Sequence, residues 1–388
     1  MKLTFENKFI VQVAWLFLFL NNISFVFMPS VTTSRLVLLF TFLGMVLLGR
    51  LRFFDKKQLS FIYLCFALSF VNLLVSIYAE GDTTQFSRFV HFALFSLFSA
   101  GMYVKIFDDE IQFHKAIVVA TLVQVAFVFI TYSSPAANNF IFSYVNVSHN
   151  FLSNLGRAPG LSSSGGATLS LIISFGAFSI VRLATLGKKA WHLPVILLIC
   201  FSQVLVGRTG LLLSLVALLL LFYYSKVNLK TIFLTIVGVV VANTLLLDFV
   251  LSNEQFLAYT LKWAESTLTG DDQTIKTLLS MGIKEMNTMD IILGSGQVAL
   301  QNGLNASGSD VGYVQTFYAA GLLGVLFYLV LFGFLYSYYK NIRNSGFFLT
   351  LLLLPFIAEL KEPFIFKYMV VFFVFTSLLY GCKNANTQ

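Results

Sequence analysis

Residues 9–29 read FIVQVAWLFLFLNNISFVFMP, an apolar run that contains no Lys, Arg, Asp or Glu. Its length is about the 20 residues that an α-helix needs to cross the hydrocarbon of a bilayer. The run lacks the small-residue cleavage site that ends a signal peptide, and further apolar runs follow along the chain. We therefore interpret residues 9–29 as the first membrane span of a polytopic protein.

The composition extends this interpretation to the whole chain of 388 residues. Hydrophobic residues make up 58% and charged residues only 11%, whereas soluble domains carry roughly 25% charged residues. We predict an all-α fold, a single multi-pass bundle of about twelve membrane helices over residues 1–388, in which the shorter spans borrow flanking residues. The predicted spans are residues 9–29, 35–49, 60–78, 86–104, 115–132, 165–184, 193–207, 211–225, 231–251, 311–336, 346–360 and 364–382.

The basic residues predict how this bundle is oriented. Cytoplasmic loops of membrane proteins are enriched in Lys and Arg, which explains the net charge of +8 without nucleic acid as a partner. With both termini in the cytoplasm, every inner loop is basic, and two longer loops, 133–164 and 252–310, lie on the periplasmic side. Loops of that length are usually functional or disordered. Within the second, residues 275–289 have the hydrophobic spacing of a short helix on the membrane surface.

Several basic residues on the predicted outer side run against this trend. Each lies within a few residues of a predicted membrane boundary, where a guanidinium suits a phosphate group. We therefore expect the outer face to bind a phosphorylated lipid. No glycine-rich phosphate loop, GxGxxG or HExxH motif occurs in the sequence, so we expect neither a cofactor nor a metal. These outer basic residues are Arg35, Arg88, Arg157, Arg208, Lys361 and Lys367.

Arg208 lies in the sequence VGRTG, residues 206–210, between two apolar runs that predict a tight hairpin. An arginine at this boundary can simply extend its head group toward the lipid phosphates. The functional interpretation rests on Gly207 and Gly210, which would let backbone and ligand approach closely.

Arg157 begins the stretch RAPGLSSSGG, residues 157–166, which leads directly into a predicted span. Its composition also fits an ordinary solvated loop, so both interpretations stay open. His149 lies a few residues upstream and could act as a base, although we expect a surface position.

Asp310 lies in the sequence SDVGY, residues 309–313, where a helix is predicted to begin. Asp is favoured as an N-cap at the positive end of the helix dipole. Capping does not exclude a role in orienting a hydroxyl group of a substrate.

Other charged residues lie near the same predicted boundary. Glu359, Lys361 and Glu362 form a compact turn between the last two spans, which mutual solvation would also explain. Arg88 and His91 lie inside the outer end of a span, on nearly one helical face. Ionisable residues within a span are functional candidates.

Four short motifs, in this order along the chain, resemble the O-antigen polymerase and ligase superfamily. RAPGL, residues 157–161, is similar to an outer-loop arginine region of that superfamily, and GRTGLL, residues 207–212, resembles its S/G-R-T/S-G-x-L segment. ILGSG, residues 292–296, looks like its f-G-x-G element. SDVGY, residues 309–313, followed by GLLG, residues 321–324, is similar to the helix that follows its large outer loop.

The resemblance implies glycosyl transfer between polyprenyl-pyrophosphate-linked oligosaccharide repeat units at the periplasmic face of the bacterial inner membrane. Arg157 and Arg208 would neutralise the departing pyrophosphate. Asp310 would orient or deprotonate the acceptor hydroxyl, with Glu359 and Glu362 as alternatives. The substrate-binding residues would be Arg88, Tyr313, Glu359, Lys361 and Glu362. A polysaccharide co-polymerase that regulates chain length is the partner typical of the family.

Within the superfamily, the ligase branch typically has a histidine in the loop-to-helix region, in a pattern such as H-N-x-x-L. This chain has SDVGY there and no histidine after His192, which favours the polymerase branch and leaves the general base open. A flippase for the same lipid-linked sugars is the main alternative from another class. It would more often carry ionisable groups in mid-membrane and have short outer loops. A purely structural membrane protein would not explain the outer arginines.

Overall fold

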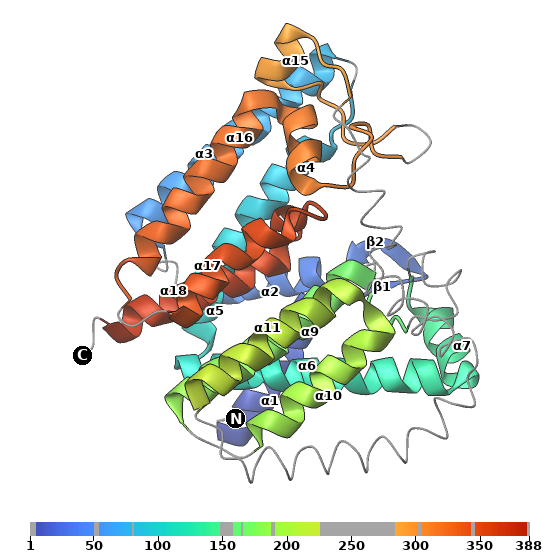
Figure 1. Cartoon of the computed structure of the whole chain (residues 1–388), viewed down its shortest axis with the longest axis vertical. Coiled ribbons are helices and arrows are strands. Elements are labelled where there is room, and N and C mark those ends of the chain that lie inside the picture. The colour runs from blue at the N-terminus through green and yellow to red at the C-terminus, as the bar shows by residue number, and fades with distance from the viewer. Residues whose placement is uncertain are drawn as a thin grey trace. The chain divides into compact units, whose positions relative to one another are not determined.

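The computed structural model describes residues 5–49, 54–79, 81–147, 158–163, 166–187, 191–225, 284–300, 304–342 and 346–385 (Figure 1). The predicted span 231–251, Arg157, His149 and most of the predicted surface helix 275–289 lie outside these ranges. The chain divides into two compact units, each described here by itself. Unit 1 comprises Met1–Gly44 and Phe107–Gly270, and unit 2 comprises Met45–Ile106 and Asp271–Gln388.

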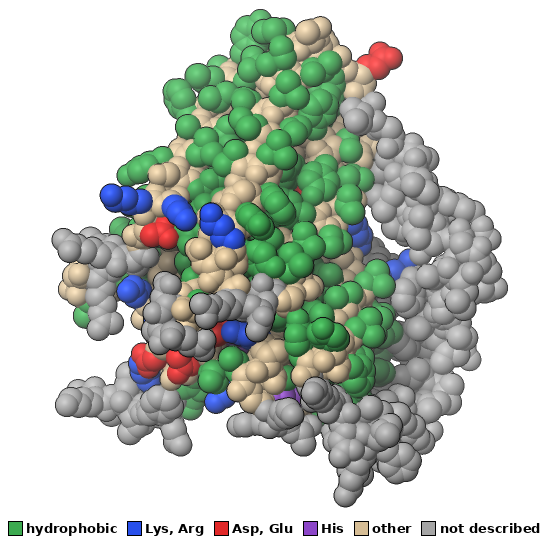
Figure 2. Space-filling model, turned by 60° about the vertical axis from the view of Figure 1, so that its left-hand side comes forward, with side chains coloured by type: hydrophobic (Ala, Val, Ile, Leu, Met, Phe, Trp, Pro, Cys, Tyr) green, Lys and Arg blue, Asp and Glu red, His purple; other side chains and the backbone are tan. Residues whose placement is uncertain are grey.

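The chain is a helical multi-pass membrane protein, as the sequence predicts. Among the described residues, six helices are long and apolar enough to cross a membrane by length and composition, and five shorter apolar helices accompany them. Hydrophobic side chains spread over the helix surfaces visible in Figure 2, and Ile77, Leu219 and Leu329 are each about two-thirds exposed (67%, 68% and 67%). Such surfaces suit contact with lipid. The six long helices are Lys56–Tyr78, Thr84–Ile106, Glu110–Ser133, Gly166–Leu186, Gly312–Tyr339 and Tyr368–Ala385.

Unit 1 is built around α9 (Gly166–Leu186), whose side chains are almost all buried. Three helices pack directly against α9: α6 (Glu110–Ser133), α10 (His192–Val206) and α11 (Arg208–Ser225). A buried ion pair joins α6 to α9, because the Arg182 guanidinium donates to both carboxylate oxygens of Glu110 at 2.6 and 3.0 Å. The unit also contains all but the last three residues of α2 (Thr33–Leu47) and the whole of α7 (Pro135–Tyr144), which lies within the predicted loop 133–164.

The first predicted span, residues 9–29, is wrong in its second half. Helix α1 (Phe5–Asn21) ends where Asn22 adopts a φ of 47°, and the Asn21 side chain donates back to the Phe17 carbonyl at 2.9 Å. Asparagine competes in this way with the helical hydrogen bonds. The chain then forms an antiparallel hairpin of β1 (Ser24–Phe25) and β2 (Met28–Thr32). Hydrophobicity alone did not reveal this turn, because its residues are nearly as apolar as the helix.

Unit 2 contains the remaining described helices. An aromatic core holds it together: Phe61 of α3 stacks on Phe334 of α16 with ring centroids 4.4 Å apart, and α3 and α16 run side by side in Figure 1. Helix α4 continues through a π-helical segment, η1, into α5. The elements are α3 (Lys56–Tyr78), α4 (Thr84–His91), η1 (Phe92–Phe98), α5 (Ser99–Ile106), α15 (Thr288–Leu293), α16 (Gly312–Tyr339), α17 (Gly346–Ala358), the 3-10 helix η2 (Phe364–Phe366) and α18 (Tyr368–Ala385).

Helix α16 reverses direction at Gly321, whose φ and ψ of 57° and −144° are not helical. Residues 312–320 consequently fold back along residues 322–339. The rings of Tyr313 and Tyr328 lie 4.8 Å apart, although fifteen residues of straight helix would separate them by about 22 Å. The predicted span 311–336 is therefore two helical segments and not one straight helix.

The loop that follows α15 supports this reversal. The Ser295 backbone N–H donates to the Tyr318 carbonyl at 2.8 Å, and the Gly296 N–H donates to the Ala319 carbonyl at 3.2 Å. These bonds satisfy carbonyl groups that the end of a helix leaves open. The same loop is fixed on its other side, because the Ser76 hydroxyl of α3 donates to the Gly296 carbonyl at 3.2 Å.

Candidate functional site

Polar side chains of unit 2 collect where α3 and α17 end and where α4, α16 and α18 begin. We call this region the polar end; it comprises residues 81–88, 304–316 and 359–367. Its segments touch one another directly: the Gly312 N–H donates to the Glu359 carbonyl at 2.9 Å, and the Arg88 guanidinium lies over the Phe366 ring at 5.9 Å. The structure thus brings Arg88, Asp310, Glu359 and Glu362 into one region.

Arg88 is held by neutral groups. Its guanidinium donates to the Gln315 Oε1 atom at 3.1 Å and, more weakly, to the Gln85 Oε1 atom at 3.4 Å. Gln315 is fixed in turn, since its amide nitrogen donates to the carbonyls of Ser309 and Asp310 at 3.2 and 3.3 Å. In the described part of the chain, no carboxylate lies within salt-bridge distance of Arg88. Its positive charge therefore remains available to an anion.

A second basic residue, Lys367, lies between η2 and α18. Burial lowers the pKa of its ammonium group; the nearby carboxylates of Glu362 and Glu359 raise it, and Arg88 lowers it further. No hydrogen bond or ion pair engages this ammonium among the residues that the structure describes. Two cations therefore lie at the polar end without a paired carboxylate.

Glu359 is fully buried, and both of its carboxylate oxygens already accept hydrogen bonds within the protein. The Tyr328 hydroxyl donates to Oε1 at 2.5 Å and the Ile365 N–H donates to Oε2 at 2.7 Å. Burial raises the pKa of Glu359 to about 7, against the lowering effect of these two hydrogen bonds and of Arg88 and Lys367. The carboxylate thus joins α16 to η2. Its predicted role in direct substrate contact does not fit this enclosed position.

Asp82 fixes the loop that leads into the polar end. Its carboxylate accepts hydrogen bonds from the backbone N–H groups of Thr84, Val298 and Ala299, at 2.7, 2.7 and 2.8 Å. Partial burial opposes ionisation, but these hydrogen bonds outweigh it and lower the pKa of Asp82. Asp82 was not a candidate from the sequence, because an acidic residue between two spans has no distinguishing pattern.

Asp310 is exposed, and its carboxylate accepts a hydrogen bond from the Asn305 amide at 2.5 Å. The N-cap of α16 is Val311, with no side-chain capping bond, so the expectation that Asp310 caps the helix is wrong. Tyr313 lies one turn further on, and its hydroxyl donates to the Phe356 carbonyl at 2.8 Å. Lys361 and Glu362 are both partly exposed at the turn that follows α17.

Arg208 belongs to unit 1 and is the first residue of α11. A single residue, Gly207, separates α11 from α10, which confirms the predicted hairpin. Gly210 has a packing role that the sequence did not suggest, because a Cβ there would meet the Ser170 carbonyl oxygen of α9. Gly210 therefore allows α9 and α11 to approach each other closely.

Arg157 lies outside the described residues, but the segment after it is described. The Ala158 N–H donates to the Leu205 carbonyl at 2.9 Å, two residues before Gly207. Residues 158–160 are buried at the tip of the α10–α11 hairpin. The two motifs quoted for the resemblance thus come together in unit 1.

Comparison with protein families, with curated proteins and with solved structures found no significant match to this chain. Within the described residues, no group of three His, Cys, Asp or Glu side chains could hold a metal ion. The chemistry open to the polar end therefore follows from its own residues. Two cations that pair with no carboxylate among the described residues, together with a set of fixed amides, can bind an anionic group. The exposed carboxylate of Asp310 can instead accept a hydrogen bond from a hydroxyl group.

Besides Asp82, three members of this arrangement were not candidates from the sequence: Gln85, Gln315 and Tyr328. Gln315 is a polar amide inside a predicted span, a signal that could have marked it, because buried polar groups in a span need partners. Gln85 lies in a polar stretch just before a predicted span and carried no such signal. Tyr328 gave no signal, since it lies among many aromatic residues of a predicted span.

Proposed function

We propose that this protein polymerises surface-polysaccharide repeat units, by transferring a polyprenyl-pyrophosphate-linked glycan onto another lipid-linked repeat unit at the periplasmic face of the bacterial inner membrane. The observation that carries the proposal is the environment of Arg88. Arg88 lies at the end of a membrane helix and is held by two glutamine amides, with no carboxylate paired to it among the described residues, so it is prepared for an anionic substrate group. The motifs that resemble the O-antigen polymerase branch support the same conclusion.

In the proposed reaction, the bond between the anomeric carbon of the donor glycan and its pyrophosphate breaks. A glycosidic bond forms to a hydroxyl oxygen of the acceptor repeat unit, and polyprenyl pyrophosphate leaves. Cations that face the pyrophosphate stabilise the negative charge that develops on it. Arg88 and Lys367 supply such charge in unit 2, and Arg157 and Arg208 are the corresponding candidates in unit 1.

The acceptor hydroxyl must lose a proton as the new bond forms. Asp310 is the carboxylate that we assign to this step, because it is exposed at the polar end, whereas Glu359 is enclosed by Tyr328 and Ile365. Glu362 is partly exposed and is the alternative.

The proposal is tested by a gel profile of surface polysaccharide from cells that lack this gene, with and without complementation. A polymerase predicts loss of the ladder, with a single repeat unit still attached to the lipid core. Loss of every repeat, with polyprenyl-linked polymer accumulating, would indicate a ligase. Accumulation of unpolymerised carrier-linked units on the inner face would indicate a flippase.

A further inference from the structure

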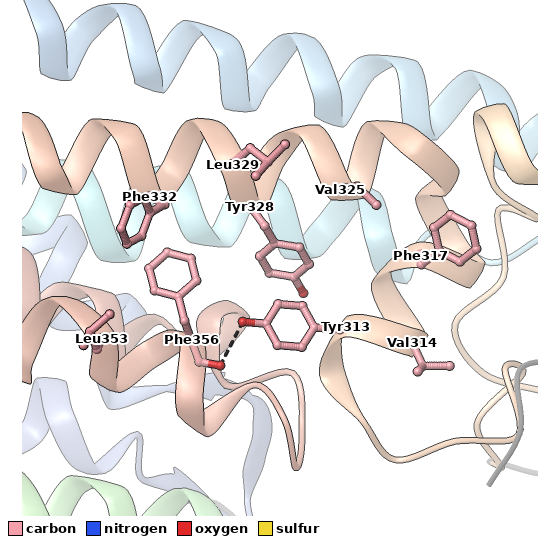
Figure 3. Close-up of a pocket in the computed structure, with 9 residues that line it drawn as sticks. All are labelled: Tyr313, Val314, Phe317, Val325, Tyr328, Leu329, Phe332, Leu353 and Phe356. Carbon is pink, nitrogen blue, oxygen red and sulfur yellow. Dashed lines mark hydrogen bonds between the residues drawn. The ribbon is translucent and has the colours of Figure 1, made fainter.

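An apolar groove of about 540 Å³ lies in unit 2 between α16 and α17 (Figure 3). This volume is within the roughly 300–1,000 Å³ of ligand sites. The groove exists because α16 reverses at Gly321, so that residues 312–320 form one wall beside residues 322–339. Its outer side is open, since Val325, Leu329 and Leu353 are 40%, 67% and 38% exposed.

The groove presents almost no polar atoms. Its two tyrosines use their hydroxyl groups elsewhere: that of Tyr313 donates to the Phe356 carbonyl, and that of Tyr328 donates to Glu359. Both tyrosines therefore offer only their rings, which point toward each other in Figure 3. The aromatic lining consists of Tyr313, Phe317, Tyr328, Phe332 and Phe356.

One end of the groove reaches the polar end. Tyr313 is three residues from Asp310, and Phe356 is three residues from Glu359 and five from Lys361. The Tyr328 side chain connects the two regions, because its ring lines the groove while its hydroxyl contacts the Glu359 carboxylate. A molecule with an anionic head and a long apolar tail would match both parts at once.

We propose that the α16–α17 groove binds the isoprenoid tail of the lipid-linked glycan, an inference that rests on the proposed function. A tail in the bilayer is already removed from water, so the hydrophobic effect does not draw it into the groove. Selection must come from close packing. The methyl branches of an isoprenoid give it an irregular outline that packs between aromatic rings, whereas a straight acyl chain leaves gaps.

The test uses the full-length protein in nanodiscs, with the photoreactive residue p-benzoylphenylalanine in place of Leu329. Radiolabelled polyprenyl phosphate is the probe. The matched control carries the same residue at Leu326, which is 50% exposed on the same helix but does not line the groove. We expect saturable labelling at position 329 that unlabelled polyprenyl phosphate displaces and phosphatidylglycerol does not. Equal labelling at both positions, or equal displacement by phosphatidylglycerol, would overturn the inference.

A second measurement asks whether filling the groove removes the binding. With the photoreactive residue at Leu353, the substitution Val325→Trp should lower labelling by about tenfold, the factor that corresponds to about 1.4 kcal/mol. Leu326→Trp places the same bulk outside the groove and should leave labelling unchanged. Undiminished labelling in folded Val325→Trp protein would count against the groove.

These outcomes separate the inference from the proposed function. If labelling is selective but gene deletion does not change the polysaccharide ladder, the groove binds the tail and the proposed polymerase function is wrong. If the ladder depends on the gene but labelling is unselective, the polymerase function stands and the groove is not the tail site.

Discussion

Gly294 and Gly321 lie directly against each other, although they are 27 residues apart in the sequence. A Cβ on Gly321 would lie 2.6 Å from the Gly294 backbone nitrogen, and a Cβ on Gly294 would lie 2.2 Å from the Ala319 carbonyl oxygen. Both residues have positive φ angles, 86° at Gly294 and 57° at Gly321. The loop after α15 and the reversal of α16 therefore depend on each other, and the groove depends on both.

Gly321→Ala should destabilise unit 2 because it adds strain at a positive φ, which costs on the order of 1–3 kcal/mol, and a clash with backbone atoms. Gly333→Ala is the matched control in the same helix, since nothing lies within 4 Å of its Cβ position. That substitution should be neutral or slightly stabilising. Thermal unfolding in detergent measures both variants, and equal melting temperatures would contradict the interlocked arrangement.

Arg88→Ala should abolish polymer formation while leaving insertion into the membrane intact. Loss of one positioned donor of this kind typically costs about 10²–10³ in rate. Arg88→Lys should restore little activity, because an ammonium cannot bridge Gln85, Gln315 and a phosphate in the same plane. The gel ladder is the measurement. Lys340→Ala is the control, since Lys340 is an exposed cation of the same unit that belongs to none of the candidate sites. A full ladder in Arg88→Ala would remove the observation on which the proposed function rests.

The same reasoning applies to the arginines of unit 1. Arg157→Ala and Arg208→Ala should each abolish the ladder without loss of inserted protein, and lysine should substitute poorly at both positions. Full activity in both alanine variants would exclude a pyrophosphate clamp in unit 1.

Gly210→Ala should destabilise unit 1, because its new methyl group would meet the Ser170 carbonyl oxygen of α9. The effect is expected on folding and not on substrate affinity, which separates it from the Arg208 variants. Gly187→Ala is the control, since its Cβ position has nothing within 4 Å. A folded Gly210→Ala protein with selectively weakened substrate binding would restore the role that the sequence suggested.

Stability should fall as the pH rises, through Glu359. Burial raises its pKa from 4.5 to about 7, so between these values the folded protein binds a proton that the unfolded chain has lost. The free energy of unfolding then decreases with increasing pH in that window, by at most roughly 1.4 kcal/mol per pH unit. Glu359→Gln should remove this component, because an amide can still accept from Ile365 and donate to Tyr328. The difference between wild-type and variant melting temperatures across the window measures the effect. An unchanged pH profile in the variant would assign the dependence to other groups.

The sequence was most informative where one physical demand dominates. A bilayer requires long apolar helices, and most of the described apolar helices begin and end within a few residues of the predicted spans. It was least informative where the chain turns inside an apolar run, as at Asn22 and Gly321. The turn at Asn22 follows a local side-chain hydrogen bond, and the turn at Gly321 depends on contact with the distant Gly294. Hydrophobicity encodes neither.

The residues of the candidate site also differ in how well the sequence predicts them. Arg88 was predicted because a charge in a membrane helix is conspicuous. Glu359 was grouped with Lys361 and Glu362 as one charged turn, yet only Glu359 is enclosed, through Tyr328 and Ile365. Sequence cannot distinguish a carboxylate in a solvated turn from one folded inward, because the difference lies in what packs over it.

The reversal at Gly321 has a consequence for biosynthesis. Residues 294–296 leave the ribosome before residue 321. They are therefore already synthesised when the chain turns at Gly321 and can form their hydrogen bonds with Tyr318 and Ala319 at once. Glu359, which ties the beginning of α16 to η2, is translated later. The turn of α16 can thus form during translation, whereas its attachment at Gly312 and Tyr328 must wait until α17 has been inserted.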